Sequence, residues 1–180
     1  MDNYHIYDQI SRKKDVTTYK ARQKQTIQYV TAKSYAKKLL GRVRNAVQLT
    51  NNLVHPNIVR FHNWYETRNH IWVVEEFCIG GTLRALRSQD RYVPESAVRR
   101  FGVDIVAGLR FLHGNGILHC NLRPTDILID EYGVMKITGF GLTVKMKSTG
   151  VPIQLPLLGV MVIVRLFGTL EGGELINVIT

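Results

Sequence analysis

Hydrophobic and polar residues alternate in the first third of the chain, in segments rich in β-branched and aromatic residues. Three such segments cover residues 4–10, 16–20 and 26–32, and two more cover 58–65 and 71–77. A period of two is typical of strands that bury one face. Polar turns separate the segments, the last of them at 66–69. The pattern therefore predicts five antiparallel strands.

Apolar residues spaced by three and four positions predict two helices. The first carries Leu40, Val43, Val47, Thr50 and Val54, and the second begins at Pro94 and carries Val98, Phe101, Ile105, Leu109 and Leu112. A short helix is expected from Thr82, after two glycines, and residues 114–116 end the long helix. Short strands at 127–129 and 134–137 follow. The predicted fold class is α+β.

Composition and charge narrow the class of protein. The 180 residues are 45% apolar, which excludes a disordered or collagen-like chain. The longest apolar run, 155–167, is too short to span a bilayer, and no secretory signal is visible, so a soluble intracellular protein without membrane contact is expected. The net charge is +10, yet residues 9–65 alone carry +11. This basic segment is either a solvated surface or a site for an acidic or phosphorylated protein partner. Nucleic acid is less favoured, because no stacking-aromatic pattern accompanies the basic residues.

The two cysteines, Cys78 and Cys120, lie far apart and belong to no cluster with ligand spacing. They support neither a disulfide framework nor a zinc site. Both are expected to be small buried hydrophobic residues in a reducing compartment.

Five local strings, in this order along the chain, carry a resemblance to a known family. They are Ile10 to Ala21, Val30-Thr31-Ala32-Lys33, His55-Pro56-Asn57-Ile58-Val59, Val74 to Leu83, and Leu112 to Pro124. Together they resemble the eukaryotic protein-kinase fold over residues 4–147. The resemblance implies a five-stranded antiparallel small lobe with one helix, followed by an incomplete helical large lobe. With Trp64 to Thr67 preserved, the pattern is most similar to the Unc-fifty-one-like and Fused group, and closest to its fourth member, which is classed as a pseudokinase.

Several positions depart from the family's catalytic pattern. The three glycines of the phosphate loop correspond to Ser11, Lys13 and Val16, whose side chains obstruct close backbone approach to phosphates. The catalytic carboxylate is replaced by Asn121, which cannot accept a proton, and Arg123 also lies in this degenerate loop. The resemblance therefore implies no catalytic residue.

The metal-binding positions have changed as well. Gly139 stands where the family's aspartate binds Mg²⁺, so that carboxylate is lost. Asp126 replaces the second metal ligand and is either a weak candidate for binding a cation or only a carboxylate of a surface loop. No metal site is predicted beyond it.

The nucleotide pocket keeps part of its pattern. The resemblance implies that Lys33, Glu76, Cys78 and Leu128 contact ATP, without Mg²⁺. Ala46 stands where the regulatory helix carries the lysine's usual glutamate, so we expect Glu75 to pair with Lys33 instead. The turn at 12–14 is basic, and its side chains either hold phosphate oxygens or block the pocket.

These features favour a protein-kinase-like pseudokinase that acts as a binding or scaffolding module. The alternatives are a serine/threonine kinase with residual ATP-dependent transfer, using Lys33 and Asp126, and a basic docking module with a vestigial nucleotide pocket. The resemblance implies a cytoplasmic role linked to microtubules or cilia.

Three segments are predicted: a small lobe at 1–78, a partial large lobe at 79–147, and a tail at 148–180 without kinase-like motifs. The family's later helices have no counterpart here, so the chain is expected to be a fragment, or else a truncation completed by a partner. Exposed apolar surface on Phe101, Ile105 and Leu109 is expected to follow.

Overall fold

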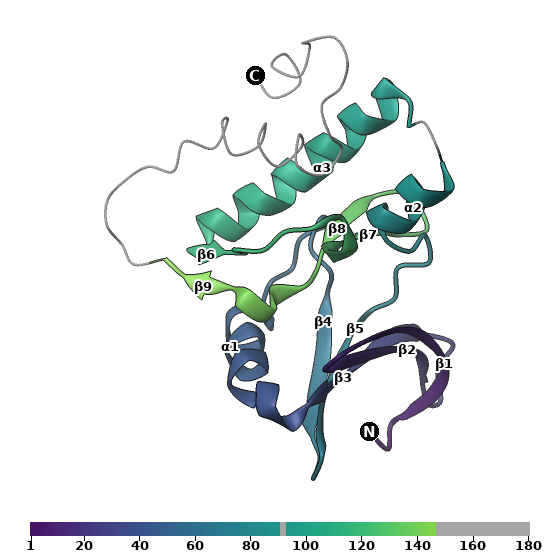
Figure 1. Ribbon diagram of the computed structural model, residues 1–180, viewed down its shortest axis with the longest axis vertical. Coiled ribbons are helices and arrows are strands. Elements are labelled where there is room, and N and C mark those ends of the chain that lie inside the picture. The colour runs from purple at the N-terminus through teal and green to yellow at the C-terminus, as the bar shows by residue number, and fades with distance from the viewer. Residues whose placement is uncertain (91–92, 147–180) are drawn as a thin grey trace.

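The chain forms two lobes in the computed structural model, which describes residues 1–90 and 93–146. A five-stranded sheet occupies the lower part of Figure 1, and the long helix α3 crosses the upper part. The predicted tail at 148–180 lies outside the described residues. The protein-kinase-like α+β fold expected from the sequence is confirmed by this architecture.

The small lobe is built on an antiparallel sheet in the order β1-β2-β3-β5-β4. Its strands are β1 (Tyr4–Lys13), β2 (Val16–Gln23), β3 (Tyr29–Ala36), β4 (Phe61–Glu66) and β5 (His70–Glu76). All five predicted strands are present, with their ends shifted by a few residues. One hydrophobic cluster of this sheet is formed by Ala21, Val30, Ala32 and Val74. The sheet therefore fixes β3 beside β5, which positions the site described below.

One helix packs on the small lobe. A short 3₁₀ turn, η1 (Lys37–Leu39), leads into α1 (Leu40–Thr50). The buried residues Val43 and Val47 of α1 pack with Ile71 and Val73 of β5. The spacing of four positions places both valines on one face of the helix, as the sequence predicts.

The second lobe contains two helices and several short elements. These are α2 (Leu83–Gln89), α3 (Glu95–Gly114), β6 (Ile117–Leu118), η2 (Pro124–Asp126), β7 (Ile127–Ile129), β8 (Met135–Ile137), η3 (Phe140–Leu142) and β9 (Val144–Lys145). Thr82 caps α2, because its hydroxyl accepts a hydrogen bond from the Ala85 N–H at 3.1 Å. The predicted long helix is present as α3, which begins at Glu95, one residue later than expected, with Pro94 at its N-cap.

The expected exposure of the apolar face of α3 is wrong. Ile105 is fully buried and Leu109 is only 6% exposed, while Phe101 is partly buried against the same cluster. Their partners include Leu83 of α2 and Ile137 of β8. The short elements that follow α3 cover its apolar face, and the sequence pattern did not reveal this because the partners are distant along the chain. Within the described residues, no helix is long and apolar enough to cross a membrane.

Candidate functional site

A lysine, a glutamate and a threonine meet at the junction of the two lobes. The Nζ of Lys33 lies 2.6 Å from Oε2 of Glu75 and donates to the Thr138 hydroxyl at 2.9 Å. That hydroxyl in turn donates to the same Glu75 oxygen at 3.1 Å. The expected pairing of Lys33 with Glu75 is therefore present, and Thr138 completes a closed triangle of polar contacts.

The register of the sheet explains this pairing. Strands β3 and β5 are antiparallel, with Thr31 opposite Glu75 and Lys33 opposite Val73. Because side chains two positions apart point to the same face of a sheet, Lys33 and Glu75 lie diagonally on one face. The Lys33 and Glu75 side chains are only 13% and 12% exposed. The ion pair is thus nearly removed from solvent.

Electrostatics favour the charged form of this lysine. Burial acts to lower the pKa of Lys33, but the charge of Glu75, the nearby Tyr35, the hydrogen bond with Glu75 and the charge of Asp126 outweigh it, so the pKa is raised. Burial also raises the pKa of the Tyr35 phenol. The lysine therefore stays a cation over the accessible pH range.

The position on α1 where the family carries the lysine's glutamate partner is an uncharged residue, Ala46. Ala46 lines a cavity of about 40 Å³ together with Glu75, Tyr35 and Phe140. The methyl side chain of Ala46 leaves this space between the helix and the sheet. Glu75 therefore meets Lys33 from the sheet itself, and α1 contributes no counter-ion to it among the described residues.

The segment after β6 holds one buried histidine and the degenerate catalytic position. Nε2 of His119 lies 2.8 Å from the Thr138 carbonyl oxygen, so Nε2 carries the proton. Nδ1 is buried without a partner in the described part of the chain. Burial lowers the pKa of His119, opposed by the Thr138 contact and the charge of Asp126. Asn121 accepts a hydrogen bond from Nε of Arg123 at 3.1 Å, so its amide orients that guanidinium.

The two cysteines behave differently. Cys78 is 7% exposed, and burial raises the pKa of its thiol to about 12, which keeps it protonated. Cys120 is exposed, so the expectation that both cysteines are buried is wrong for Cys120. Cys120 also has a positive φ of 62°, which turns the chain sharply between His119 and Asn121.

Asp126 and Gly139 occupy the places where the sequence suggested changed metal ligands. Gly139 has a φ of 85°, and a Cβ placed on it would lie 2.8 Å from Cγ and Oδ1 of Asp126. Burial raises the pKa of Asp126, opposed by the charges of His119, Lys13, Lys33 and Arg123. The described residues contain no group of three or more His, Cys, Asp or Glu side chains arranged to hold a metal ion.

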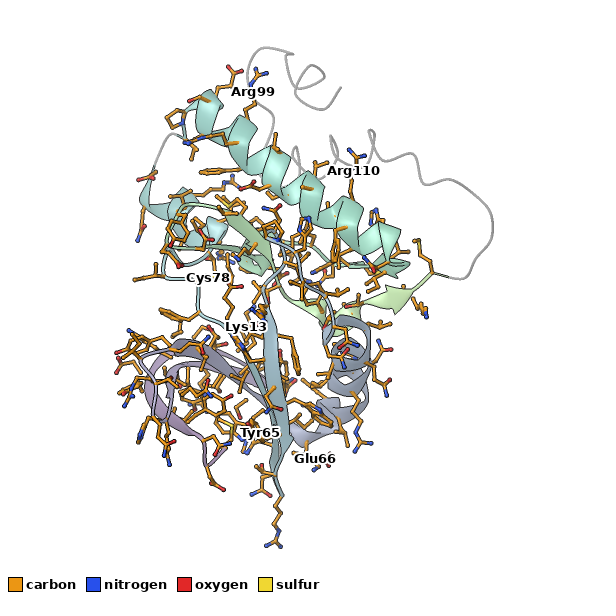
Figure 2. All side chains as sticks on the ribbon, turned by 180° about the vertical axis from the view of Figure 1, so that it is seen from behind. Lys13, Tyr65, Glu66, Cys78, Arg99 and Arg110 are labelled. Carbon is orange, nitrogen blue, oxygen red and sulfur yellow. The ribbon has the colours of Figure 1, made fainter. Side chains whose placement is uncertain are left out.

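The remaining predicted nucleotide contacts lie along the connection between the lobes. Glu76 is held by the Arg60 N–H at 3.0 Å and by Nζ of Lys136 at 2.8 Å. Leu128 pairs with Lys136 across β7 and β8 and is partly buried. Cys78 lies two residues after the end of β5, and Figure 2 shows it at the junction of the lobes. The fold thus brings the segment that follows β5 next to β7, while Glu75 of β5 pairs with Lys33.

The expected phosphate loop is a tight hairpin. Strands β1 and β2 join through a two-residue turn, with Lys13 opposite Val16 and Ser11 opposite Thr18. Lys13 also lines an open cavity of about 580 Å³ that Arg123 lines from the other lobe. Lys13 of the basic turn therefore faces this cavity.

Sequence reasoning missed two parts of this site. Thr138 was not predicted, although it directly precedes Gly139 in a motif that was recognised. The arginines of α2, Arg84 and Arg87, also line the cavity below Lys13 and were not singled out. Their signal was weak, because the basic residues of α2 lie outside the strongly charged segment 9–65.

Comparisons with known proteins agree with this geometry. The protein kinase domain family matches residues 4–157. The chain is 43% identical over 146 residues, 81% of its length, to serine/threonine-protein kinase RUNKEL of Arabidopsis thaliana, and 44% identical over 140 residues, 78% of its length, to serine/threonine-protein kinase ULK4 of Mus musculus. It is 31% identical over 146 residues, 78% of its length, to serine/threonine-protein kinase 36 of Pongo abelii. The matched part is 11% of each relative's length. These relatives agree with the Unc-fifty-one-like and Fused group expected from the sequence.

Proposed function

The chain belongs to the protein kinase domain family, and from that premise we propose that it is a pseudokinase, a binding or scaffolding module that holds ATP without Mg²⁺ and transfers no phosphoryl group. The observation that carries this proposal is the crowding at Gly139. A Cβ at that position would lie 2.8 Å from Cγ and Oδ1 of Asp126, and any side chain there requires a left-handed backbone that side chains rarely adopt. The site therefore disfavours the aspartate that the family uses to bind Mg²⁺.

Loss of the catalytic base supports the same proposal. Asn121 stands where the family carries a carboxylate, and its amide oxygen is engaged by Arg123 at 3.1 Å. An amide does not accept a proton from a hydroxyl, so general-base assistance, worth a factor of about 10² to 10⁴, is missing.

ATP remains compatible with the residues that are present. An ammonium group has three donors, and Lys33 uses two of them, on Glu75 and Thr138. The third is available for a phosphate oxygen. The segment from Glu76 to Cys78 and the side chain of Leu128 provide the edge and floor for an adenine ring, as the resemblance implies. A bound nucleotide supplies a polyanion here, and the chain's own part is to hold and orient it.

The experiment combines binding and transfer. We expect ATP to raise the melting temperature equally with Mg²⁺ and with EDTA, and we expect no radiolabel transfer from [γ-³²P]ATP to myelin basic protein. Lys33→Met should remove the thermal shift. Transfer that disappears in Lys33→Met overturns the proposal and establishes a kinase.

A residual serine/threonine kinase is the second candidate. The names of the relatives, both serine/threonine-protein kinases, favour it, as does the Asp126 carboxylate, whose charge acts on Lys33. If this candidate is correct, transfer requires a divalent cation and is lost in Asp126→Ala. A third reading, a basic docking module, requires that ATP cause no thermal shift under either condition.

The proposed cellular setting is cytoplasmic, with a link to microtubules or cilia. Only the family resemblance supports this setting. Co-sedimentation of the chain with polymerised tubulin tests it, and a chain that stays in the supernatant at all tubulin concentrations contradicts the microtubule link.

A further inference from the structure

The open cavity that Lys13 and Arg123 line lies at the junction of the lobes. It measures about 580 Å³, within the range of about 300–1,000 Å³ that is usual for ligand sites. Its lining comes from the end of β1, from α2 and from the start of η2, and comprises Lys13, Arg84, Arg87, Ser88, Arg123, Pro124 and Thr125. Figure 2 shows Lys13 beside this junction. Three segments that are distant in sequence therefore converge on one space.

The charge of this cavity is entirely positive. Four of its seven lining residues are Lys or Arg, and no carboxylate lines it among the described residues. Lys13, Arg84 and Arg123 form no ion pair with any described carboxylate, whereas Lys37 and Arg44 both pair with Glu66. Asp126 follows Thr125 and packs against Gly139, and its charge acts on Lys13 and Arg123. One carboxylate does not neutralise Lys13, Arg84 and Arg123 together, so an anionic ligand relieves the repulsion that remains among them.

The polar groups of the lining are mainly hydrogen-bond donors. Among the described residues that line the cavity, Pro124 is the one without a polar side chain. The Ser88 hydroxyl already donates to the Arg84 carbonyl oxygen at 3.0 Å. Recognition therefore depends on the ammonium and guanidinium donors, which select charge.

Arginine is the side chain best suited to phosphate. Its planar fork donates two parallel hydrogen bonds to one phosphate, and Arg clusters are a recurring means of recognising phosphorylated peptides. A phosphorylated serine carries a charge of about −1.5 to −2 and three acceptor oxygens. The guanidinium groups of Arg84 and Arg123 and the ammonium of Lys13, around a cavity of this size, match that group together with an adjoining acidic residue.

We propose that this cavity binds a phosphorylated peptide segment of a protein partner, with Arg84 and Arg123 as its principal ligands and Lys13 closing over it from the small lobe. The inference rests on the proposed binding role and specifies the chemistry of the partner.

The test measures fluorescence anisotropy of a fluorescein-labelled nonapeptide with one central phosphoserine flanked by glutamates. The full chain is titrated in its wild-type form and as Arg84→Glu, Lys13→Glu and the control Arg110→Glu. Arg110 is also exposed, and Figure 2 places it on α3, away from Lys13. Each variant is first shown to have the melting temperature of the wild type.

We expect the phosphopeptide to bind at least about tenfold more tightly than its unphosphorylated form. Arg84→Glu and Lys13→Glu should each weaken binding about tenfold, and Arg110→Glu should leave it unchanged. Equal affinity for both peptides, or an equal effect of Arg84→Glu and Arg110→Glu, overturns the inference. A single-stranded oligonucleotide that binds more tightly with the same Arg84 dependence overturns it as well.

ATP in EDTA is titrated in parallel, so that the two proposals fail separately. Phosphopeptide binding without ATP binding contradicts the nucleotide part of the proposed function and supports the cavity. If saturating ATP displaces the phosphopeptide, the cavity belongs to the phosphate end of the nucleotide site, and the inference is overturned.

Discussion

Two groups of cations lie at the junction of the lobes, and they differ in how their charge is neutralised. Lys33 is nearly buried and contacts Glu75 at 2.6 Å. The cavity cations, Lys13, Arg84 and Arg123, are exposed and form no ion pair with described carboxylates. A buried charge needs an internal partner, since burial without one costs several kcal/mol, whereas an exposed charge is stabilised by water until a ligand arrives.

The contrast separates the part of the site that holds the fold together from the part that is free to bind. The Lys33 triangle joins the β3–β5 sheet of the small lobe to Thr138 of the other lobe. The cavity cations contribute no such link among the described residues. Substitutions in the first group should therefore reduce stability, and substitutions in the second should reduce binding.

The largest effect is expected from Glu75→Ala, which leaves Lys33 buried without its partner. We expect it to lower the free energy of unfolding by roughly 3 kcal/mol, measured by urea denaturation. Glu66→Ala is the matched control, because Glu66 also contacts two cations, Lys37 and Arg44, but is a third exposed. Its loss should lower the free energy of unfolding much less, because solvent screens exposed ion pairs. Equal losses in the two variants contradict the distinction between buried and exposed pairs.

Gly139→Asp should lower the free energy of unfolding by about 2 kcal/mol. It places a side chain on a residue with a left-handed backbone, and the added Cβ meets Asp126. Gly133→Asp has a similar φ of 79° with open space around it, and isolates the backbone cost of about 1 kcal/mol. Chemical denaturation of both measures the difference. The account of the lost metal ligand is wrong if two results are found together. The first is that Gly139→Asp lowers the free energy of unfolding no more than Gly133→Asp does. The second is that the double variant Gly139→Asp with Asn121→Asp transfers a phosphoryl group.

Local patterns predicted much of this fold. Residue spacing revealed the five strands and the helix after Pro94, and the loss of glutamate at Ala46 pointed to Glu75 as the partner of Lys33. A missing counter-ion is visible in one sequence once the strand that carries the lysine is recognised, since a buried lysine requires a carboxylate nearby.

Long-range packing was less accessible. The burial of Ile105 and Leu109 depends on β7 and β8, which lie more than fifteen positions away. The cavity combines Lys13 with Arg123 across 110 positions of chain, and a count of charges by segment does not bring them together. Thr138 joins the triangle from 105 positions beyond Lys33. Contacts of this kind come from how the lobes meet, which periodicity does not describe.

Acidification should lower the free energy of unfolding through His119. Its folded pKa lies below the ordinary 6.5, so the unfolded chain binds the proton first and the stabilisation present above pH 6.5 is lost as pH falls. The slope is at most about 1.4 kcal/mol per pH unit for this histidine. Urea midpoints between pH 7.5 and 5.5 measure this slope.

His62 and His113 also have lowered pKa values because of burial, and they add to the slope. His119→Gln should therefore reduce the slope without removing it. An unchanged slope in His119→Gln contradicts its burial as a neutral group.

The smallest effect on stability is expected from Arg84→Ala. Its side chain is exposed and forms no ion pair with described carboxylates, so the free energy of unfolding should change by less than about 0.5 kcal/mol. Thermal denaturation against the wild type measures this. A loss comparable to that of Glu75→Ala shows that the cavity cations also support the fold, which removes the contrast between the two groups.

The most direct test of the central claim is isothermal titration calorimetry of ATP into the full chain, once in EDTA and once in excess Mg²⁺. We expect dissociation constants that agree within about twofold, since no carboxylate stands at Gly139 to hold the metal, together with loss of binding in Lys33→Met. Binding that appears only with Mg²⁺, or that is tenfold tighter with it, contradicts the account.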